Sequence, residues 1–362
     1  MKYNLGKRLA SQPGPALITG HTGFKGTWLT LLLESLGIPV VGFSLPPEKD
    51  SLFEMTEREG LIPEKFSSIL DRASFLDFIT ETKPTTVFHL AAQPLIIKSY
   101  EDPLETFEIN ALGTATILDA CSRISSIKGV LVSTTDKVYK NDDSYGYRFI
   151  ESDQLGAVDP YSGSKVAAEA AISIWQKLQS NYSLVSARAG NVIGGGDVAK
   201  DRLIPDLVRA MMSNGQIEIR NINSTRPWQH VIDPLIGYIV AIEKMLEGVV
   251  KVPAFNFGPV ENGMEVKHVV ELFKNTYVGD LKIHNPTKKS SNVVEKEFLQ
   301  ISSNLAKDTL GWHPVWNQKE AIEMSAYWWK SVNRGIKSPL EATMFDIATT
   351  LKKLEKEDLN DK

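Results

Sequence analysis

Cysteine is almost absent from this sequence, because Cys121 is the only one in 362 residues. A single thiol excludes an internal disulfide and a zinc site built from several cysteines, and it fits a reducing compartment. Long apolar runs are also lacking, since no stretch reaches the roughly 18 uncharged apolar residues that a membrane helix needs. The opening segment MKYNLGKRLA has no apolar core with a cleavage site. We therefore expect a cytoplasmic protein with no signal peptide and no membrane partner.

An excess of charge of either sign is missing as well. The 40 basic residues stand against 44 acidic ones, which gives a net charge of -4 at pH 7. A nucleic-acid footprint normally shows as a clustered basic excess, so we expect no nucleic-acid partner. With 42% hydrophobic and 23% charged residues, the chain has the composition of a soluble globular protein, with one large or two ordinary domains.

Short apolar runs alternate with helical patterns through the first half. Strands are predicted at Ala16–Thr19, Pro39–Phe43, Thr86–Leu90, Gly129–Thr134 and Ser183–Ala187. Helices are predicted at Lys25–Leu36, Pro103–Cys121 and Tyr161–Leu178. This strict alternation predicts an α/β fold of the Rossmann type, with a doubly wound parallel sheet and helices on both of its faces.

The second half mixes helices with short strands. Helices are predicted at Leu203–Ser213, Pro234–Leu246 and Val266–Asn275, and strands at Ile217–Ile219, Phe255–Phe257 and Leu281–His284. We predict a first domain over 1–190 with a return segment at about 232–258, a smaller mixed α/β lobe over 191–231 and 259–340, and a solvated charged tail over 341–362. The tryptophans of the last part, predicted to pack the lobe and its terminal helix, are Trp312, Trp316, Trp328 and Trp329.

Three glycines in ITGHTGFKG follow the first predicted strand and open the first helix. Gly20, Gly23 and Gly26 would let the pyrophosphate of a dinucleotide approach the backbone, where a helix N-terminus supplies N–H donors and a favourable dipole. In this strand–turn–helix context the motif predicts a dinucleotide site. Its loop also contains Thr22, Phe24 and Lys25. The alternative is a tight turn that only packs helix on strand.

The features that would hold the adenosine half are less specific. An acidic residue that binds the ribose is expected about 20 residues after the glycine loop. Ser44 stands where that acid would lie, and Glu48 comes later in a loop, so this feature leaves NAD and NADP both open. Asp71 and Arg72 are either adenine contacts or an ordinary surface pair.

Tyr161 and Lys165 lie four residues apart in PYSGSKVAAE, at the start of a predicted helix, and so share one face. Tyrosine, with a pKa of about 10, is a poor base at neutral pH, and a nearby ammonium favours its phenolate. We predict that Lys165 lowers the pKa of Tyr161, which then takes a hydroxyl proton while the carbon gives its hydride to a nicotinamide. The alternative is an exposed helix start, since such a spacing also arises by chance.

Thr135, Asp136 and Lys137 follow directly on a predicted strand in TTDKVYKN. They come just beyond its carboxyl end, where doubly wound sheets place their sites. Without its flanking segments, this position favours a loop ion pair with Thr135 as a cap. A catalytic triplet is predicted only together with those segments.

Together with its flanking segments, the triplet resembles that of the extended short-chain dehydrogenases/reductases, the NAD-dependent epimerase/dehydratase family, and specifically its CDP-glucose 4,6-dehydratases. The resemblance rests on the GxxGxxG spacing and on TGHTGFKGTWL, VFHLAAQPL, TTDKVYKN, DPYSGSKVAAE, ARAGNVIGGGD, DRLIPD and TRPWQHV, with weaker likeness through LGWHPVW. Related dTDP- and GDP-sugar dehydratases carry Asp-Glu where this chain has Asp136-Lys137. The resemblance implies NAD as cofactor and CDP-glucose, or a related nucleotide sugar, as substrate.

The resemblance also implies roles for single residues. Asp136 would protonate the leaving C6 hydroxyl, and Lys137, or a water that it holds, would take the C5 proton. Further cofactor contacts implied are Leu90, Ala91, Ala92, Asn110 and Thr134, and substrate contacts are Gln93, Asn191, Arg202, Leu203, Arg220 and Arg226. Helix hydrogen bonding is the other role open to Asn110, and stacking on Trp228 at the surface is the other role open to Arg226.

Several further expectations follow from the same resemblance. The GGGD segment, 194–197, resembles a flexible substrate loop, although three glycines also permit any turn. A homodimer, or a higher homo-oligomer, is expected through the helices near 103–121 and 161–178. The implied role is deoxysugar biosynthesis for lipopolysaccharide O-antigen. His21 and His89 have no partners at ligand spacing, so we expect no metal site.

Two other functions remain open at this point. A nucleotide-sugar epimerase or decarboxylase would share the fold, the cofactor and the Tyr161–Lys165 pair, but simple C4 epimerisation needs no acid to expel a hydroxyl. A non-catalytic NAD-binding sensor or scaffold would not need an intact Thr135, Tyr161 and Lys165.

Overall fold

A seven-stranded parallel sheet forms the centre of the computed structural model, which describes residues 5–142, 145–178, 181–213, 215–219, 221–284 and 298–360. Its strands are β1 Ala16–Thr19, β2 Val40–Ser44, β3 Glu64–Phe66, β4 Thr86–His89, β5 Gly129–Thr135, β6 Ser183–Ala189 and β11 Ala254–Phe257. Their order across the sheet is β11-β6-β5-β4-β1-β2-β3. The residues of β1, β2 and β4 are all buried, which is why these strands appear in the sequence as continuous apolar runs.

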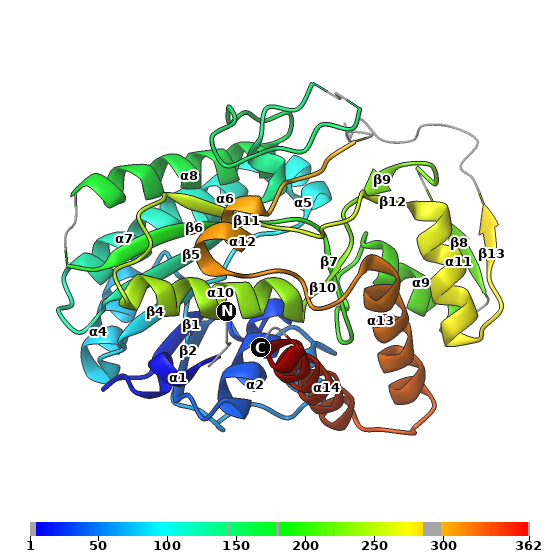
Figure 1. Cartoon of the computed structure of the whole chain (residues 1–362), viewed down its shortest axis with the longest axis horizontal. Coiled ribbons are helices and arrows are strands. Elements are labelled where there is room, and N and C mark those ends of the chain that lie inside the picture. Colours follow the sequence, from blue (N-terminus) through cyan, green and yellow to red (C-terminus); the bar gives the residue numbers. More distant parts are fainter. Residues whose placement is uncertain are drawn as a thin grey trace.

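Helices cover both faces of this sheet (Figure 1). On one side lie α4 Arg72–Thr82, α7 Gly113–Ser122 and α8 Pro160–Leu178, and on the other lie α2 Phe24–Ser35, α10 Ile232–Leu246 and α12 Asn304–Leu310. The predicted doubly wound α/β fold is confirmed. The bounds of its predicted strands agree with the structure to within one or two residues.

The helix predicted at Pro103–Cys121 is not uniform. It consists of α6 Pro103–Phe107, a π-helical turn η1 at Glu108–Leu112, and α7. A short helix, α5 Ile96–Glu101, precedes it. Single π-turns inside helices occur often at functional sites, and Asn110 lies in this one.

The lobe at the right of Figure 1 is built from short strand pairs and helices, as the sequence predicts. Its helices are α9 Leu203–Met212, α11 Val266–Tyr277 and α13 Gln318–Asn333. Its strands are β8 Gln216–Glu218 with β13 Lys282–His284, β9 Thr225–Arg226 with β12 Met264–Glu265, and β7 Val192–Ile193 with β10 Gln229–His230. Between them the segment 232–258 crosses back to the sheet, where β11 pairs with β6.

The solvated tail predicted over 341–362 is wrong for the part that the structure describes. Residues Pro339–Asn360 form a helix, α14, whose Ala342, Ile347 and Leu354 are buried. The buried face of α14 also contains Thr343, Asp346 and Thr350, so polar and apolar side chains share it. These polar residues and the many charges of the segment hide the buried face in the sequence.

The C-terminal tryptophans pack as predicted. Trp312 and Trp328 are fully buried, and Trp329 is nearly so. Trp316 packs against the same core and donates through Nε1 to Thr350 Oγ1 of α14 at 3.0 Å. The remaining short elements are α1 Lys7–Ala10, α3 Leu52–Met55 and a 3₁₀ turn, η2 Asp136–Val138. Among the residues described, no helix has the length and apolar character to cross a membrane.

Candidate active site

The glycine loop connects β1 to α2 at the carboxyl edge of the sheet. Gly20 has a φ of 75°, and a Cβ there would lie 2.8 Å from the backbone of Ala91. A Cβ on Gly26 would lie 2.0 Å from the carbonyl oxygen of Gly20, so both positions require glycine for the loop to pack. Gly23 differs, because its only close neighbour would be Gly20 O at 3.4 Å. The loop is therefore tightly packed at Gly20 and Gly26, whereas the backbone of Gly23 has free space beside it.

The N-terminus of α2 has no side-chain cap. Its N-cap residue is Gly23. The first-turn N–H groups of a helix have no intrahelical partner, and together with the helix dipole they favour an anion. The loop and this helix end thus have the chemistry of a pyrophosphate site.

The region where an adenosine would lie has no acid at the end of β2. Ser44 belongs to that strand, and its Oγ lies 2.7 Å from Thr22 Oγ1, which also donates to Leu45 O at 3.1 Å. Asp71 is the N-cap of α4 and accepts from Ser74 N at 3.0 Å. The partner of Arg72 is Asp119, at 2.5 Å, in a surface ion pair.

The three residues Thr135, Asp136 and Lys137 lie at the end of β5 and in η2. Thr135 Oγ1 donates to Asp136 Oδ1 at 3.1 Å, and Lys137 Nζ lies 3.6 Å from the same oxygen. The side chain of Asp136 is only 1% exposed, yet Oδ2 has no hydrogen-bond partner among the residues described. A Cβ on Gly190 would lie 3.2 Å from that oxygen, so glycine leaves room beside it. Lys137 Nζ also donates to Asn191 Oδ1 at 3.4 Å.

Tyr161 faces this triplet from the first turn of α8. Burial raises the pKa of Tyr161 to about 12, while a hydrogen bond with Thr135 opposes the rise. The predicted lowering of this pKa by Lys165 is therefore wrong for the protein alone. The sequence shows that the two side chains share a helix face, but it does not show how deeply the phenol is buried.

Lys165 and Lys25 approach each other from opposite helices, α8 and α2. Burial, followed by the charge of Lys25, lowers the pKa of Lys165 to about 8. Burial, followed by the charge of Arg202, lowers the pKa of Lys25 to about 8. Lys165 Nζ donates to Ser133 O at 3.4 Å, and Lys25 Nζ donates to Tyr238 OH at 3.5 Å. The two ammonium groups make this edge of the sheet positive and suited to an anionic ligand.

The residues after β4 complete the floor of the cluster. Leu90 N donates to Thr19 O at 3.1 Å, and Ala91, beside Gly20, is followed by Ala92. Asn110 is buried and donates to Gln93 O and to Ser164 Oγ, each at 2.9 Å. Asn110 thus joins η1 both to the loop after β4 and to α8, and the amide of Gln93 bonds Thr106 and Leu95.

Arg202 is the N-cap residue of α9 and extends toward the cluster. Its Nη1 lies 3.0 Å from Asp197 Oδ2, and its charge is felt by both Tyr161 and Lys25. Burial opposes protonation of Arg202, but the charge of Asp197 and its hydrogen bond raise the pKa. Leu203 begins α9 and packs partly against the core.

The segment 194–197 is packed rather than open. A Cβ on Gly195 would overlap Trp328 at 1.9 Å, and one on Gly194 would lie 2.8 Å from Val231. All four residues of the segment are buried. The glycines are thus accounted for by close packing, and Asp197 of the same segment holds Arg202.

Two further predicted substrate residues belong to the segment that ends in β9. Arg226 is on β9, beside β12, and its Nη1 donates to Thr225 O at 3.0 Å. Arg220 lies outside the described residues. Trp228 is buried and donates to Met264 O at 3.1 Å, which gives it a framework role.

The two histidines near the cluster are hydrogen-bonded within the protein. His21 Nε2 lies 2.7 Å from Glu64 Oε2, and His89 Nδ1 lies 2.6 Å from Thr19 Oγ1. Burial lowers the pKa of His89 to about 3. Across the described ranges, no group of three or more His, Cys, Asp or Glu side chains is placed to hold a metal ion.

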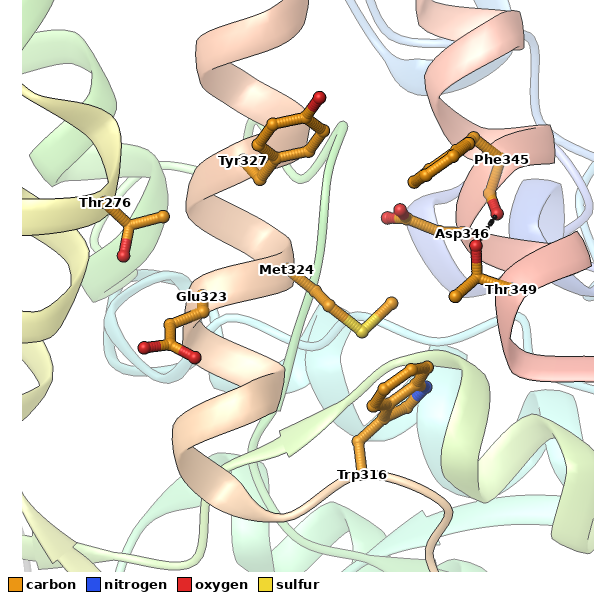
Figure 2. A pocket seen from close by; sticks show the side chains of 8 residues that line it. All are labelled: Thr276, Trp316, Glu323, Met324, Tyr327, Phe345, Asp346 and Thr349. Atoms are coloured by element: carbon orange, nitrogen blue, oxygen red, sulfur yellow. Dashed lines mark hydrogen bonds between the residues drawn. The ribbon is translucent and has the colours of Figure 1, made fainter. Parts of the chain in front are cut away.

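A pocket of about 290 Å³ lies elsewhere, between α13 and α14 (Figure 2). Met324 and Tyr327 point into it from α13, Phe345 and Asp346 from α14, and Trp316 from its floor. None of these side chains belongs to the cluster at the edge of the sheet. The pocket is therefore separate from the candidate active site.

Several residues of the site are missed by the sequence analysis. Tyr238 contacts the cluster only through the tertiary fold, and no local pattern marks it. Asp197 ends the GGGD segment, for which the sequence predicts a substrate loop but no role for the aspartate. Glu169 is different, since it ends the segment PYSGSKVAAE, four residues after Lys165. That helical spacing is a signal that could have identified it.

Comparison with known proteins gives relatives along most of the chain. A 330-residue match, 40% identical, covers 88% of this chain and 91% of a CDP-glucose 4,6-dehydratase from Salmonella typhimurium. A CDP-paratose 2-epimerase from Salmonella typhi is 24% identical, with 87% of this chain and 99% of that protein covered.

Solved structures share the fold at lower identity. The UDP-glucose 4-epimerase of Thermotoga maritima, solved with UDP-glucose, superposes with a TM-score of 0.77 at 19% identity over 88% of this chain and 99% of that one. The dTDP-glucose 4,6-dehydratase of Bacillus anthracis, solved with NAD, gives 0.74 at 19% identity over 89% and 98%. The model of the NAD dependent epimerase/dehydratase family matches residues 16–258. The chain belongs to the NAD dependent epimerase/dehydratase family.

Proposed function

We propose that this protein is a CDP-glucose 4,6-dehydratase, which converts CDP-glucose to CDP-4-keto-6-deoxyglucose and water. The observation that carries the proposal is the buried Oδ2 of Asp136, close to Tyr161 and without a hydrogen-bond partner among the described residues. We assign to this carboxyl group the protonation of the hydroxyl that must leave. The 40% identity to a CDP-glucose 4,6-dehydratase along most of both chains supports the same substrate.

The proposed cofactor is NAD, and the residues present fit it. The open side of Gly23 and the uncapped start of α2 would hold its diphosphate, with Gly20, Gly26, Thr22, Phe24 and Lys25 shaping the loop. Leu90, Ala91, Ala92, Asn110, Thr134 and Lys165 would lie along its nicotinamide half, and Asp71 and Arg72 near its adenine. When bound, NAD supplies the hydride acceptor for C4 and the hydride donor for C6.

The proton steps are assigned to the side chains of the cluster. Tyr161, held by Thr135, takes the proton of the C4 hydroxyl, and the cation Arg202 favours its phenolate. The C4 ketone acidifies the C5 hydrogen, which Lys137 or a water that it holds removes. Asp136 protonates the C6 hydroxyl as it leaves. Each of these positioned groups typically contributes about 10²–10⁴-fold to the rate.

The substrate is proposed to lie between the two parts of the chain. Residues 1–190 with 232–258 would bind NAD, and 191–231 with 259–340 would bind the nucleotide sugar. Arg202 and Arg226 suit a diphosphate, because a guanidinium offers paired, charge-assisted hydrogen bonds. The other proposed substrate contacts are Gln93, Asn191, Leu203 and Arg220.

CDP-glucose labelled with deuterium at C4 tests the function. Loss of one water with the deuterium retained at C6 of the product, followed by mass spectrometry, is the expected result. An isomerised sugar of unchanged mass would identify an epimerase instead. If CDP-glucose is untouched, a panel of other nucleotide sugars tests the nucleobase.

We also propose a cytoplasmic homodimer that supplies deoxysugar for lipopolysaccharide O-antigen. Five large apolar side chains are exposed along α6, η1 and α8, namely Leu104, Phe107, Leu112, Ile174 and Leu178. Burying such side chains against a second copy would favour association. Sedimentation at several concentrations tests this, and a monomer at all of them would contradict it.

A further inference from the structure

A buried carboxylate lies directly behind the candidate active site. Glu169 is on α8, one turn after Lys165 and two turns after Tyr161, so the three share a helix face. Its Oε1 accepts from Thr134 Oγ1 at 2.6 Å and from Ser186 Oγ at 2.5 Å. Only about a twentieth of its surface is exposed.

Arg188 on β6 completes a buried ion pair with this carboxylate. Its Nη2 donates to Glu169 Oε2 at 2.7 Å, and its Nε donates to Oε1 at 3.0 Å. Burial opposes the charge of Arg188, but the hydrogen bonds and charge of Glu169 outweigh it and raise the pKa. The fork-to-fork geometry fixes the two side chains relative to each other.

The pair also holds both ends of the segment that carries the triplet. Thr134, which precedes Thr135, donates to Glu169. Tyr139, which follows η2, accepts from Arg188 Nη1 at 3.0 Å and donates to Asn256 Oδ1 at 2.6 Å. Residues 135–138 are thus bracketed by two contacts to one buried charge pair.

We infer that Glu169, through its pair with Arg188, is a positioning residue that sets Thr135, Asp136 and Lys137 against Tyr161 and Lys165. The inference rests on the proposed function, because only that function gives the two sets of side chains a common substrate. Reactive groups that are misplaced by about 1 Å lose roughly 10²-fold in rate. Glu169 is a buried carboxylate of α8 whose hydrogen bond to Thr134 ties this helix to the end of β5.

Glu169 also acts on Lys165 through its charge. Lys165 faces Lys25 on α2, His89 on β4, and Tyr161 and Glu169 on its own helix. Lys25 disfavours the ammonium form of Lys165, whereas Glu169 favours it. Removing the negative charge of Glu169 therefore makes Lys165 lose its proton at lower pH.

A role in folding alone is the competing explanation, since breaking a buried ion pair destabilises a protein whatever its function. Glu243 provides a matched control for that effect. It is buried to a similar degree on α10, and it accepts from Arg8 N at 2.9 Å and Gly6 N at 3.2 Å. Glu243→Gln removes a buried charge with backbone partners, far from the cluster in the sequence and on another helix.

The test compares Glu169→Gln with Glu243→Gln, using CDP-glucose turnover and thermal melting. Both variants are expected to melt at a lower temperature than the wild type. Only Glu169→Gln is expected to lose kcat, by roughly 10²-fold, with KM unchanged. The alkaline limb of its kcat/KM profile is expected to move to lower pH. Equal kcat values for the two variants, or an unmoved alkaline limb, would overturn the inference.

A second pair of variants decides the matter if Glu169→Gln does not fold. Tyr139→Phe removes the hydrogen bond from Arg188 to the residue that follows η2, whereas Ser186→Ala removes a hydrogen bond to the carboxylate of Glu169 away from the triplet. Tyr139→Phe is expected to lower kcat while Ser186→Ala leaves it unchanged, and equal effects would overturn the inference. Wild-type turnover separates the two claims: an inactive wild type contradicts the proposed function, whereas an active one with an equally active Glu169→Gln contradicts only the positioning role.

Discussion

Asp136 and Lys137 are joined through one carboxylate oxygen only. Oδ1 of Asp136 lies 3.6 Å from Lys137 Nζ, while Oδ2 is buried without a partner among the described residues. An unpaired buried oxygen is costly, so we propose that a substrate group occupies the place beside it. With this arrangement, Asp136 can act as the acid and Lys137 as the base of the proposed elimination.

Asp136→Asn tests the acid role. The amide keeps the shape and the contact with Thr135 but has no proton to give a leaving hydroxyl. We expect the rate of water loss to fall by about 10²–10⁴-fold, with KM little changed. Mass spectrometry of the sugar product measures this loss. Asp77→Asn, on the exposed face of α4, is the control, and an Asp136→Asn enzyme as fast as that control would contradict the role.

Gly23→Ala tests the open side of the glycine loop. A methyl group there meets only Gly20 O, at 3.4 Å, so the fold has room for it. It would nevertheless stand where a diphosphate approaches the backbone. We expect NAD to bind about tenfold more weakly or worse, a loss of about 1.4 kcal/mol, at an unchanged melting temperature. Isothermal titration with NAD measures the affinity.

Gly26→Ala is the matched comparison for that experiment. Its methyl group would lie 2.0 Å from the Gly20 carbonyl oxygen, so the loop must move. This variant is expected to lose stability as well as affinity. If Gly23→Ala also melts early, the two glycines do not differ in the way that the loop geometry implies.

The sequence predicts those elements whose hydrophobic pattern matches their burial in the structure. The strands of the sheet are buried on both faces and bounded by turns, so β1 is predicted residue for residue. The helix α14 is not, because its buried Ala342, Ile347 and Leu354 are outnumbered by charges. The hydrophobic pattern fails there because the buried face of α14 is partly polar, with Thr343, Asp346 and Thr350 among its members.

The candidate site is likewise predicted only in part. The sequence predicts Thr135, Tyr161 and Lys165 from their spacing and from their place after a strand or at a helix start. Lys25 on α2 lies close enough to Lys165 on α8 for its charge to lower the pKa of Lys165. No local sequence pattern predicts this proximity, because it depends on how the two helices pack at the sheet edge. The pKa of Tyr161 is mispredicted for the same reason, since burial is a property of the whole fold.

Arg202→Lys tests the substrate contact proposed on α9. A lysine keeps the charge but loses the planar fork that pairs with Asp197 on one side and would reach a diphosphate on the other. Losing a charge-assisted hydrogen bond costs about 1.5–3 kcal/mol, so KM for CDP-glucose should rise by about 10- to 100-fold. Steady-state kinetics measure it.

Arg209→Lys is the control on the same helix. Arg209 is exposed and paired with Asp206, and it should tolerate the change. A KM that rises equally in both variants would mean that α9 itself, rather than Arg202, is disturbed. A KM that rises in neither would remove Arg202 from the proposed substrate contacts.

Asp346, in the pocket of Figure 2, gives a prediction about stability and pH. Burial raises its pKa from 3.8 to about 8, against the charge of Lys337, and its Oδ2 lies 4.0 Å from His230 Nε2. Between pH 4 and pH 8 the folded protein thus keeps a proton that the unfolded chain has lost. Stability must therefore fall as pH rises through this range, by at most about 1.4 kcal/mol per pH unit for this group, and level off above pH 8.

Asp346→Asn removes that dependence, because the amide does not titrate. We expect the variant and the wild type to have similar stability near pH 4, and the variant to become progressively the more stable one toward pH 8. Urea unfolding at a series of pH values measures the difference, in which every other titrating group cancels. Asp77→Asn should follow the wild type throughout. Parallel curves for Asp346→Asn and the wild type would show that Asp346 is ionised in the folded protein, with its charge satisfied within the α13–α14 pocket.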